Sequence, residues 1–283
     1  MKVRLRRLRI RLRDEFRGCG ERLRAPLTVR HPATMSREWP VTGRCPHRCD
    51  LWDGDRSPVF ASRSVNGTAF GIGLDVDDHG NVIVVVEGPS AAGKTTWCLS
   101  HAECFVAEYV PTGDEPEGTH PETQADYWVS VNSRRWSQAL ELERRTGLAI
   151  CDSDPLKLHY SWCLSMIGAA PRSRWEFELD VTRRAFEVRA LGLADLVLIG
   201  TPPLGRLLQQ RAGDLTRRRR HFELHARLRE PLVEWYQAVE DLDPGRVVWE
   251  LPDQGIPDPL PPPRSTRTSV EFLDALVASL PVP

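Results

Sequence analysis

The chain has 283 residues, of which 41% are hydrophobic and 27% charged, and its formal net charge is -1. This length allows one large or two small domains with a buried core. The sequence has no run of about 18 apolar residues, the length that a membrane-spanning helix needs, so no membrane partner is expected. The near-zero net charge argues against a molecule whose whole surface attracts nucleic acid.

Basic residues are concentrated at the start of the chain, where residues 1–24 hold ten Lys or Arg. We interpret residues 1–78 as a basic, poorly ordered N-terminal extension and residues 79–283 as one α/β domain. A basic amphipathic helix for a membrane surface or an organelle address is the alternative for the first segment.

The seven cysteines are an odd number without regular spacing. Without a secretory signal, we expect reduced thiols and a cytoplasmic protein. Cys45, His47 and Cys49 have the spacing of half a zinc site. No second half follows at a standard distance, so a loop with free thiols is favoured.

From residue 81 onward, short apolar segments alternate with stretches of helical pattern. The five predicted strands are residues 82–86, 104–107, 148–151, 195–199 and 246–251. Helices are predicted at residues 95–103 and 133–145 and, after a proline-rich loop at 252–263, at 269–280, where Thr268 and Glu271 would form a capping box. This alternation predicts a three-layer α/β fold with a central five-stranded parallel sheet and helices on both faces.

A phosphate-binding motif follows the first predicted strand. Residues 87–96 read Glu-Gly-Pro-Ser-Ala-Ala-Gly-Lys-Thr-Thr, which is the P-loop pattern of Gly, four residues and Gly-Lys-Thr. Gly88 and Gly93 let the backbone curl so that N–H groups face phosphate oxygens, Lys94 reaches the β- and γ-phosphates, and the Thr95 hydroxyl can bind Mg²⁺. The residues expected to contact the nucleotide are Gly88, Pro89, Ser90, Ala91, Ala92, Gly93, Lys94, Thr95 and Thr96.

The sequence on either side of this motif makes a chance match improbable. A chance match in a chain of this length has a probability of about 1%. Here the motif also lies between a Val/Ile strand and a helical segment, as phosphate binding at a helix N-terminus requires. A glycine-rich turn without a ligand is the alternative.

The order of these features resembles that of the P-loop kinases of small molecules, which include nucleoside, deoxynucleoside and nucleoside-monophosphate kinases. The resemblance covers residues 81–283. It implies a P-loop NTPase fold with an Arg-rich lid, ATP and Mg²⁺ as cofactors, and a nucleoside- or nucleotide-like small molecule as phosphate acceptor.

The resemblance also implies a catalytic base at the end of the second predicted strand. In deoxynucleoside kinases an acid at this place accepts the proton of the substrate hydroxyl, and here that position is Glu108. A solvated strand-end carboxylate is the alternative. Those kinases often carry Pro and Trp soon after the acid, whereas here Pro111 follows and the next Trp is Trp128, so the substrate stays open.

Two acids follow the next predicted strand. By the resemblance, Asp152 would bind Mg²⁺ or its waters together with Thr95, and Asp154 would touch the acceptor. Similar kinases often have Arg directly after the acid, which this chain lacks. An Asx-turn at the start of a loop is the alternative.

The following segment would line the acceptor pocket. Tyr160 is the predicted substrate contact, and Lys157 is a weaker candidate. Aromatic residues at helical spacing also fit core packing.

The last implied part is an Arg-rich lid over the triphosphate. Arg211 would bind the nucleotide, and Arg217 and Arg218 would join Lys94 in stabilising charge on the phosphoryl group. A solvated basic helix face, or a contact with nucleic acid, is the alternative.

The sequence therefore predicts an ATP-dependent kinase of a small molecule. Its predicted catalytic residues are Lys94, Glu108, Asp152, Arg217 and Arg218. An NTP hydrolase or nucleotide-gated switch is one alternative, and a protein that binds nucleic acid through its Arg-rich segments is another.

Overall fold

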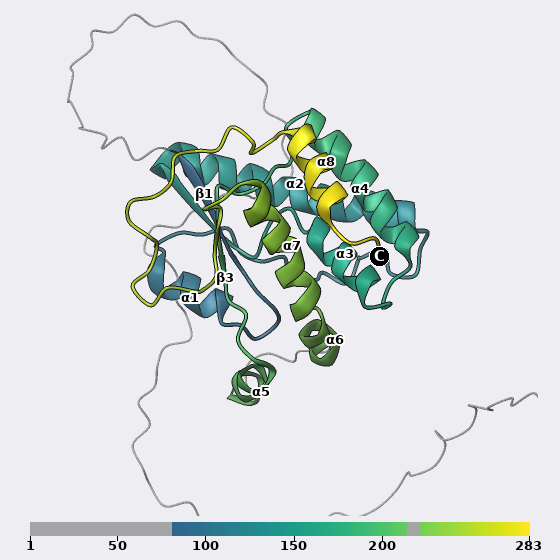
Figure 1. Ribbon diagram of the computed structural model, residues 1–283, viewed down its shortest axis with the longest axis horizontal. Helices are drawn as coiled ribbons and strands as arrows, with labels where there is room; N and C mark the ends of the chain where they lie inside the picture. Colours follow the sequence, from purple (N-terminus) through teal and green to yellow (C-terminus); the bar gives the residue numbers. More distant parts are fainter. Residues whose placement is uncertain (1–80, 214–220) are drawn as a thin grey trace, which may run out of the picture. The chain divides into compact units, whose positions relative to one another are not determined.

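The computed structural model describes residues 81–213 and 221–283 (Figure 1). The predicted extension at 1–78, with Cys45, His47 and Cys49, lies outside the described residues, and so do Arg217 and Arg218. The described elements are β1 (Val82–Glu87), α1 (Lys94–His101), α2 (Pro121–Thr146), β2 (Leu148–Asp152), α3 (Leu158–Met166), α4 (Arg172–Glu187), β3 (Leu196–Ile199), α5 (Leu204–Gly213), α6 (Phe222–Arg227), α7 (Arg229–Leu242), β4 (Val247–Val248) and α8 (Val270–Ser279).

The strands form one parallel sheet in the order β2-β1-β3-β4. β1 is central, and Val84 pairs with Ile150 of β2 on one side and with Leu196 of β3 on the other. All six residues of β1 are buried, as expected for an apolar strand with neighbours on both edges. The predicted α/β class with a parallel sheet is confirmed.

The prediction of five strands is wrong, because the described residues contain four. Residues 104–107 contribute a single parallel bridge from Val106 to Cys151 at the free edge of β2. The Val106 N–H donates to the Ile150 carbonyl oxygen at 2.8 Å, and the Asp152 N–H donates to the Val106 carbonyl oxygen at 2.8 Å. Val106 alone is buried among these four residues, so the segment has too little apolar surface to hold a longer ladder against the sheet.

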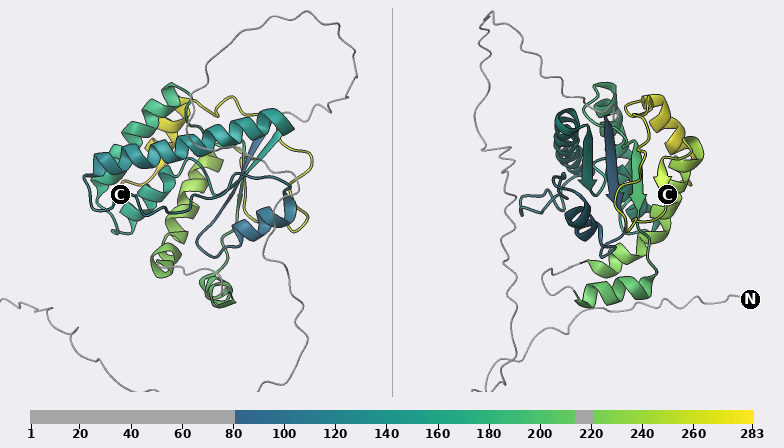
Figure 2. Two further views of the ribbon diagram at one scale, coloured as in Figure 1. Left: turned by 180° about the vertical axis from the view of Figure 1, so that it is seen from behind. Right: turned by 90° about the vertical axis from the view of Figure 1, so that its left-hand side faces the viewer.

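Helices cover both faces of the sheet, as the right-hand view of Figure 2 shows. Because side chains alternate along a strand, β1 supplies both cores. Ile83 and Val85 belong to the larger core, with Trp136 of α2, Trp162 of α3 and Trp235 of α7. Val84 points to the smaller core, which includes Trp97 of α1. The sheet is thus the middle of three layers.

Local signals explain where the helices begin and end. Helix α2 begins with Pro121 at its first turn and ends at Gly147, whose φ of 77° suits glycine. The predicted capping box at Thr268 is wrong by one residue. The Ser269 hydroxyl caps α8 instead, accepting a hydrogen bond from the Phe272 N–H at 3.0 Å.

The proline-rich stretch at 252–263 forms neither helix nor strand, as predicted. Within the described residues, no helix combines the length and apolar character needed to span a membrane.

The helical layer contains a buried carboxyl group whose charge should cost stability. Burial raises the pKa of Glu178 on α4 to about 7, although Arg174 and a hydrogen bond from Ser161 oppose this rise. The unfolded chain ionises this group near its ordinary value of 4.5, whereas the folded protein keeps the proton until about 7. The free energy of unfolding therefore falls as the pH rises from 4.5 to about 7, and the loss is complete above about pH 7.

We predict that Glu178→Gln removes this loss. Above pH 7 the variant should unfold with a free energy higher than that of the wild type by on the order of 3 kcal/mol, and the gain should vanish near pH 4. Urea denaturation across this range measures the difference. Glu176→Gln is the matched control, since Glu176 lies exposed on the same helix beside Arg172. A gain for Glu178→Gln that is the same at both pH extremes would contradict the prediction.

Candidate active site

The P-loop joins β1 to α1 at the carboxyl end of the sheet. Gly88 has a φ of 149°, and a Cβ atom there would lie 2.3 Å from the Gly200 carbonyl oxygen. Gly93 begins α1 with a φ of 92°, and Ala91 also has a positive φ, of 72°. Backbones that alternate in this way form concave surfaces of N–H groups that bind anions. Gly88 is thus required both by its conformation and by the close approach of the Gly200 carbonyl oxygen, whereas Gly93 is required by its conformation alone.

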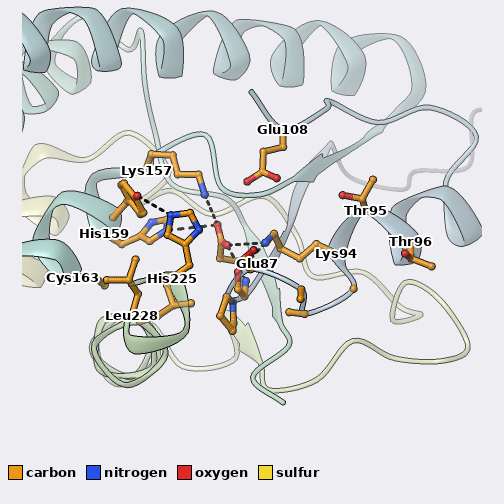
Figure 3. A pocket seen from close by; sticks show the side chains of 18 of the residues that line it. Glu87, Lys94, Thr95, Thr96, Glu108, Lys157, His159, Cys163, His225 and Leu228 are labelled. Atoms are coloured by element: carbon orange, nitrogen blue, oxygen red, sulfur yellow. Dashed lines mark hydrogen bonds and ion pairs between the residues drawn. The ribbon is translucent and has the colours of Figure 1, made fainter. Parts of the chain in front are cut away.

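A cavity of about 460 Å³ lies against this loop (Figure 3). Every residue from Gly88 to Thr96 lines it, together with Glu108 from the segment after α1. The rest of the lining is Glu87, Leu99, Lys157, His159, Tyr160, Cys163, His225, Leu228 and Leu232. Of the residues predicted to form the site, the whole P-loop, Glu108 and Tyr160 therefore meet at one cavity.

Thr95 and Asp152 come together from α1 and the end of β2. The Thr95 hydroxyl donates to Asp152 Oδ2 at 2.7 Å. The other carboxylate oxygen, Oδ1, is buried without a hydrogen-bond partner among the described residues. Burial raises the pKa of Asp152, and the hydrogen bond from Thr95 opposes the rise. An unpartnered buried oxygen beside a threonine hydroxyl suits Mg²⁺, which typically binds one or two carboxylates together with substrate phosphates.

Glu87, the last residue of β1, is an acidic group that was not predicted to be part of the site. Its carboxylate is buried and accepts four hydrogen bonds, which come from the Gly88 N–H at 2.8 Å, the Ser153 hydroxyl at 3.1 Å, the Asp154 N–H at 2.9 Å and Lys157 Nζ at 3.2 Å. Lys94 Nζ lies 3.9 Å away. Burial alone would raise the pKa of Glu87, but the charges of Lys157 and Lys94 hold it well below its usual range.

The signal that could have indicated Glu87 is its place in the sequence. Glu87 directly follows five apolar residues and directly precedes Gly88, the first residue of the P-loop. A carboxylate at such a position is buried by the sheet around it and must find partners.

Glu108 lies at the cavity wall, and a buried arginine ties its segment to β2. Arg135 of α2 donates from Nε to the Ala107 carbonyl oxygen at 3.1 Å and from one terminal nitrogen to the Asp152 and Ser153 carbonyl oxygens, each at 2.8 Å. Charged donors make strong bonds to carbonyl groups. One side chain thereby fixes the segments that carry Glu108 and Asp152.

Tyr160 and Asp154 differ in their access to the cavity. Tyr160 lines it, and its hydroxyl lies 3.2 Å from His225 Nε2 of α6. Asp154 is buried beneath the lining, where its carboxylate accepts from the Tyr236 hydroxyl at 2.9 Å and from the Leu156 N–H at 2.8 Å. The structure therefore does not bring Asp154 to the surface where an acceptor would bind.

The predicted lid is described only at its beginning. Arg211, near the end of α5, pairs with Glu223 at 2.6 Å and lies over the ring of Phe222 at 4.6 Å. It does not line the cavity. Its contact with nucleotide stays a prediction, as do those of Arg217 and Arg218, which fall outside the described residues.

A second cavity of about 500 Å³ also borders the P-loop. It shares Ala91, Gly93 and Thr96 with the first. Its other lining residues come from α1, α5 and the loop after β4, and are Trp97, Ser100, His101, Arg206, Gln210, Gly213, Leu251 and Asp253. The phosphate-binding loop therefore borders two hollows.

No family model matches the chain, and no curated protein matches it. Similar solved structures include deoxyadenosine kinase from M. mycoides with the products dCMP and a flexible dCDP bound, which is 14% identical over 70% of this chain and 100% of that chain, with a TM-score of 0.43. The same enzyme with bound dATP is 16% identical over 59% of this chain and 90% of that chain, with a TM-score of 0.42.

A third structure, the same enzyme with bound dCTP, is 14% identical over 59% of this chain and 89% of that chain, with a TM-score of 0.39. These neighbours are P-loop nucleoside kinases, the group that the order of sequence features resembles.

Proposed function

We propose that this chain is an ATP-dependent phosphotransferase that acts on the hydroxyl group of a nucleoside- or nucleotide-like acceptor. One observation carries the proposal: the complete P-loop and Glu108 line the same cavity. A phosphate donor held by the loop and an acceptor beside the carboxylate would then be neighbours. Such proximity supplies much of the catalysis in phosphoryl transfer.

Each side chain has a chemical task in this proposal. Glu108 accepts the proton of the acceptor hydroxyl as that oxygen attacks the γ-phosphorus. Lys94 leaves the Gly88 carbonyl oxygen, to which Nζ now donates at 2.8 Å, and binds the β- and γ-phosphate oxygens. The ammonium group stabilises the charge that develops on these oxygens during transfer.

Thr95 and Asp152 are the residues that would hold Mg²⁺, and their geometry fits this ion. When bound, Mg²⁺ neutralises phosphate charge and orients the phosphate oxygens. The hydrogen bond between Thr95 and Asp152 keeps both oxygens at one place before the ion and nucleotide arrive.

The far end of the cavity suits a ring-bearing acceptor. Tyr160, Cys163, Leu228 and Leu232 supply apolar surface, and the Tyr160 hydroxyl and His225 add polar groups. Ligand sites of this kind combine apolar walls with a few polar groups that fix orientation. For the nucleotide base, the second cavity, which Trp97 and Asp253 line, offers a place beside the same loop.

Acceptor-dependent turnover of ATP tests the proposal. The full chain is assayed for ADP release with Mg²⁺ and ATP, alone and with a panel of deoxynucleosides, nucleosides, nucleoside monophosphates and aminoglycosides. We expect slow release alone and a marked acceleration by one class of acceptor. Rapid release that no acceptor changes would identify an NTP hydrolase instead.

Glu108→Gln tests the base. Without a proton acceptor, kcat should fall by about 10²-fold to 10⁴-fold. The affinity for ATP should change little, since Glu108 is not part of the P-loop. Steady-state kinetics with the best acceptor measure both. Glu117→Gln is the matched control because Glu117 is exposed in the same segment and does not line the cavity. An unchanged kcat for Glu108→Gln would assign the proton to another group.

A further inference from the structure

Lysine is rare in this chain, and its placement is uneven. The sequence has 38 Lys and Arg residues, of which only Lys2, Lys94 and Lys157 are lysines. Two of these three converge on one buried carboxylate, that of Glu87. Figure 3 shows Glu87 between the two ammonium groups, with Glu108 across the cavity. A compact ammonium group differs from a guanidinium as a point charge that suits phosphate oxygens.

Glu87 fixes the position of Lys157. The carboxylate is itself held by the Gly88 N–H, the Asp154 N–H and the Ser153 hydroxyl, so it offers Lys157 a rigid anchor at 3.2 Å. His159 Nε2 lies 3.6 Å from the same carboxylate. Burial lowers the pKa of His159 to about 3, despite the charge of Glu87, so this ring is neutral at neutral pH. Two ammonium groups therefore face one carboxylate.

The ammonium group of Lys157 is available to a ligand. Its side chain retains 26% exposure and lines the cavity, whereas the Glu87 side chain is 3% exposed. An ammonium group has three N–H donors, and the described residues accept a hydrogen bond from one of them. Burial alone would lower the pKa of Lys157, but the charges of Glu87 and Glu108 raise it, so the group is charged at neutral pH.

Lys157 is one of two cationic side chains in the described part of the cavity lining. Among the described residues that line the cavity, Lys94 and Lys157 are the only Lys or Arg side chains. Glu87 and Glu108, the two acids of the lining, balance these two charges. Once Lys94 turns to the β- and γ-phosphates, Lys157 is the remaining cation between the P-loop and Glu108. A triphosphate held by the P-loop would direct its terminal phosphate toward this region.

We propose that Lys157 is a second phosphate-binding and catalytic lysine, which contacts the terminal phosphoryl group of the bound triphosphate, and that Glu87 is its positioning residue. The inference rests on the proposed function only in that a nucleoside triphosphate occupies the P-loop. It adds a residue that distinguishes triphosphate from diphosphate. It also places a positive charge beside the group that is transferred.

Lysine labelling of the wild-type full chain tests the contact without any substitution. The protein is reductively dimethylated with Mg²⁺ alone, with ADP and with the non-hydrolysable analogue AMPPNP, and peptides containing each lysine are quantified by mass spectrometry. AMPPNP should slow the labelling of Lys94 and Lys157 by about fivefold or more, as expected for donors engaged by phosphate. ADP should protect Lys94 alone, and Lys2 serves as the internal control. Equal labelling of Lys157 with ADP and AMPPNP would overturn the proposal.

Substitution provides the second arm. In calorimetric titrations, Lys157→Gln should weaken AMPPNP binding by about tenfold and ADP binding by less than about threefold, the loss expected for one charged contact to phosphate. Lys157→Arg should recover most of the loss, since the charge remains. Glu87→Gln should lower the preference for AMPPNP over ADP, and Glu87→Asp should restore part of it. Equal weakening of both ligands by Lys157→Gln would leave Lys157 as a structural partner of Glu87 only.

Different results would refute the proposed kinase function and the proposed phosphate contact of Lys157. Lys157-dependent binding of AMPPNP without transfer to any acceptor would refute the kinase and support the phosphate contact. Phosphoryl transfer to an acceptor, together with an unchanged preference for AMPPNP over ADP in Lys157→Gln, would support the kinase and refute the phosphate contact of Lys157. A wild-type chain that binds neither nucleotide would refute both.

Discussion

Lys94→Ala is expected to reduce phosphoryl transfer by about 10³-fold or more, because it removes a cation aligned with the charge that develops on the phosphate. Lys94 is the P-loop lysine, and its ammonium group already lies at the cavity wall, 2.8 Å from the Gly88 carbonyl oxygen. The fold should persist, since Glu87 keeps its hydrogen bonds from Lys157 and from the backbone.

Two measurements separate activity from folding in this variant. The rate of ADP release with the best acceptor should fall to the background, while thermal unfolding should change by only a few degrees. Arg211→Ala is a useful comparison, because this residue pairs with Glu223 away from the cavity and tests the lid prediction independently. Retention of a tenth or more of the wild-type rate in Lys94→Ala would contradict the phosphate-binding role assigned to Lys94.

Gly88→Ala is expected to have the largest effect on stability. A Cβ atom at this position would lie 2.3 Å from the Gly200 carbonyl oxygen, which is backbone and cannot turn aside as a side chain does. The φ of 149° adds strain, because side chains of L-residues rarely adopt it. Together these effects should lower the free energy of unfolding by about 3 kcal/mol or more.

Gly93→Ala is the matched control within the same loop. Its φ of 92° is also unfavourable for alanine, but an added Cβ would meet no atom within 4 Å. This variant should lose about 1–2 kcal/mol, the cost of the backbone conformation alone. Chemical denaturation compares the two. Equal losses would show that the close approach of Gly200 does not limit residue 88.

Much of the fold is local enough to be predicted from the sequence. The P-loop, the apolar strand before it and the strand that ends at Asp152 each appear in a short window. The second predicted strand could not be predicted correctly from its local sequence. Residues 104–107 have the composition of a strand, but their pairing depends on how much surface the edge of β2 offers, and only Val106 bridges it.

The polar groups around the site are harder to predict because their partners are distant. Glu87 is held by Ser153, Asp154 and Lys157, which lie 66, 67 and 70 residues farther along the chain. Arg135 reaches main-chain carbonyl groups of two different segments from within a helix rich in charged residues. The periodicity around Arg135 does not distinguish it from an exposed charge. The apolar run before Glu87 indicates burial but not its partners, which only the parallel crossovers of the sheet bring to it.

The destination of the γ-phosphate tests the central claim most directly. The full chain is incubated with Mg²⁺, ATP labelled at the γ-phosphate and the acceptor that most accelerates ADP release, and the labelled products are separated. If the cavity holds donor and acceptor side by side, the label should appear in the organic acceptor, in equal amount to the ADP formed. Label that appears only as inorganic phosphate, at a rate that no acceptor changes, would contradict phosphoryl transfer and identify a hydrolase.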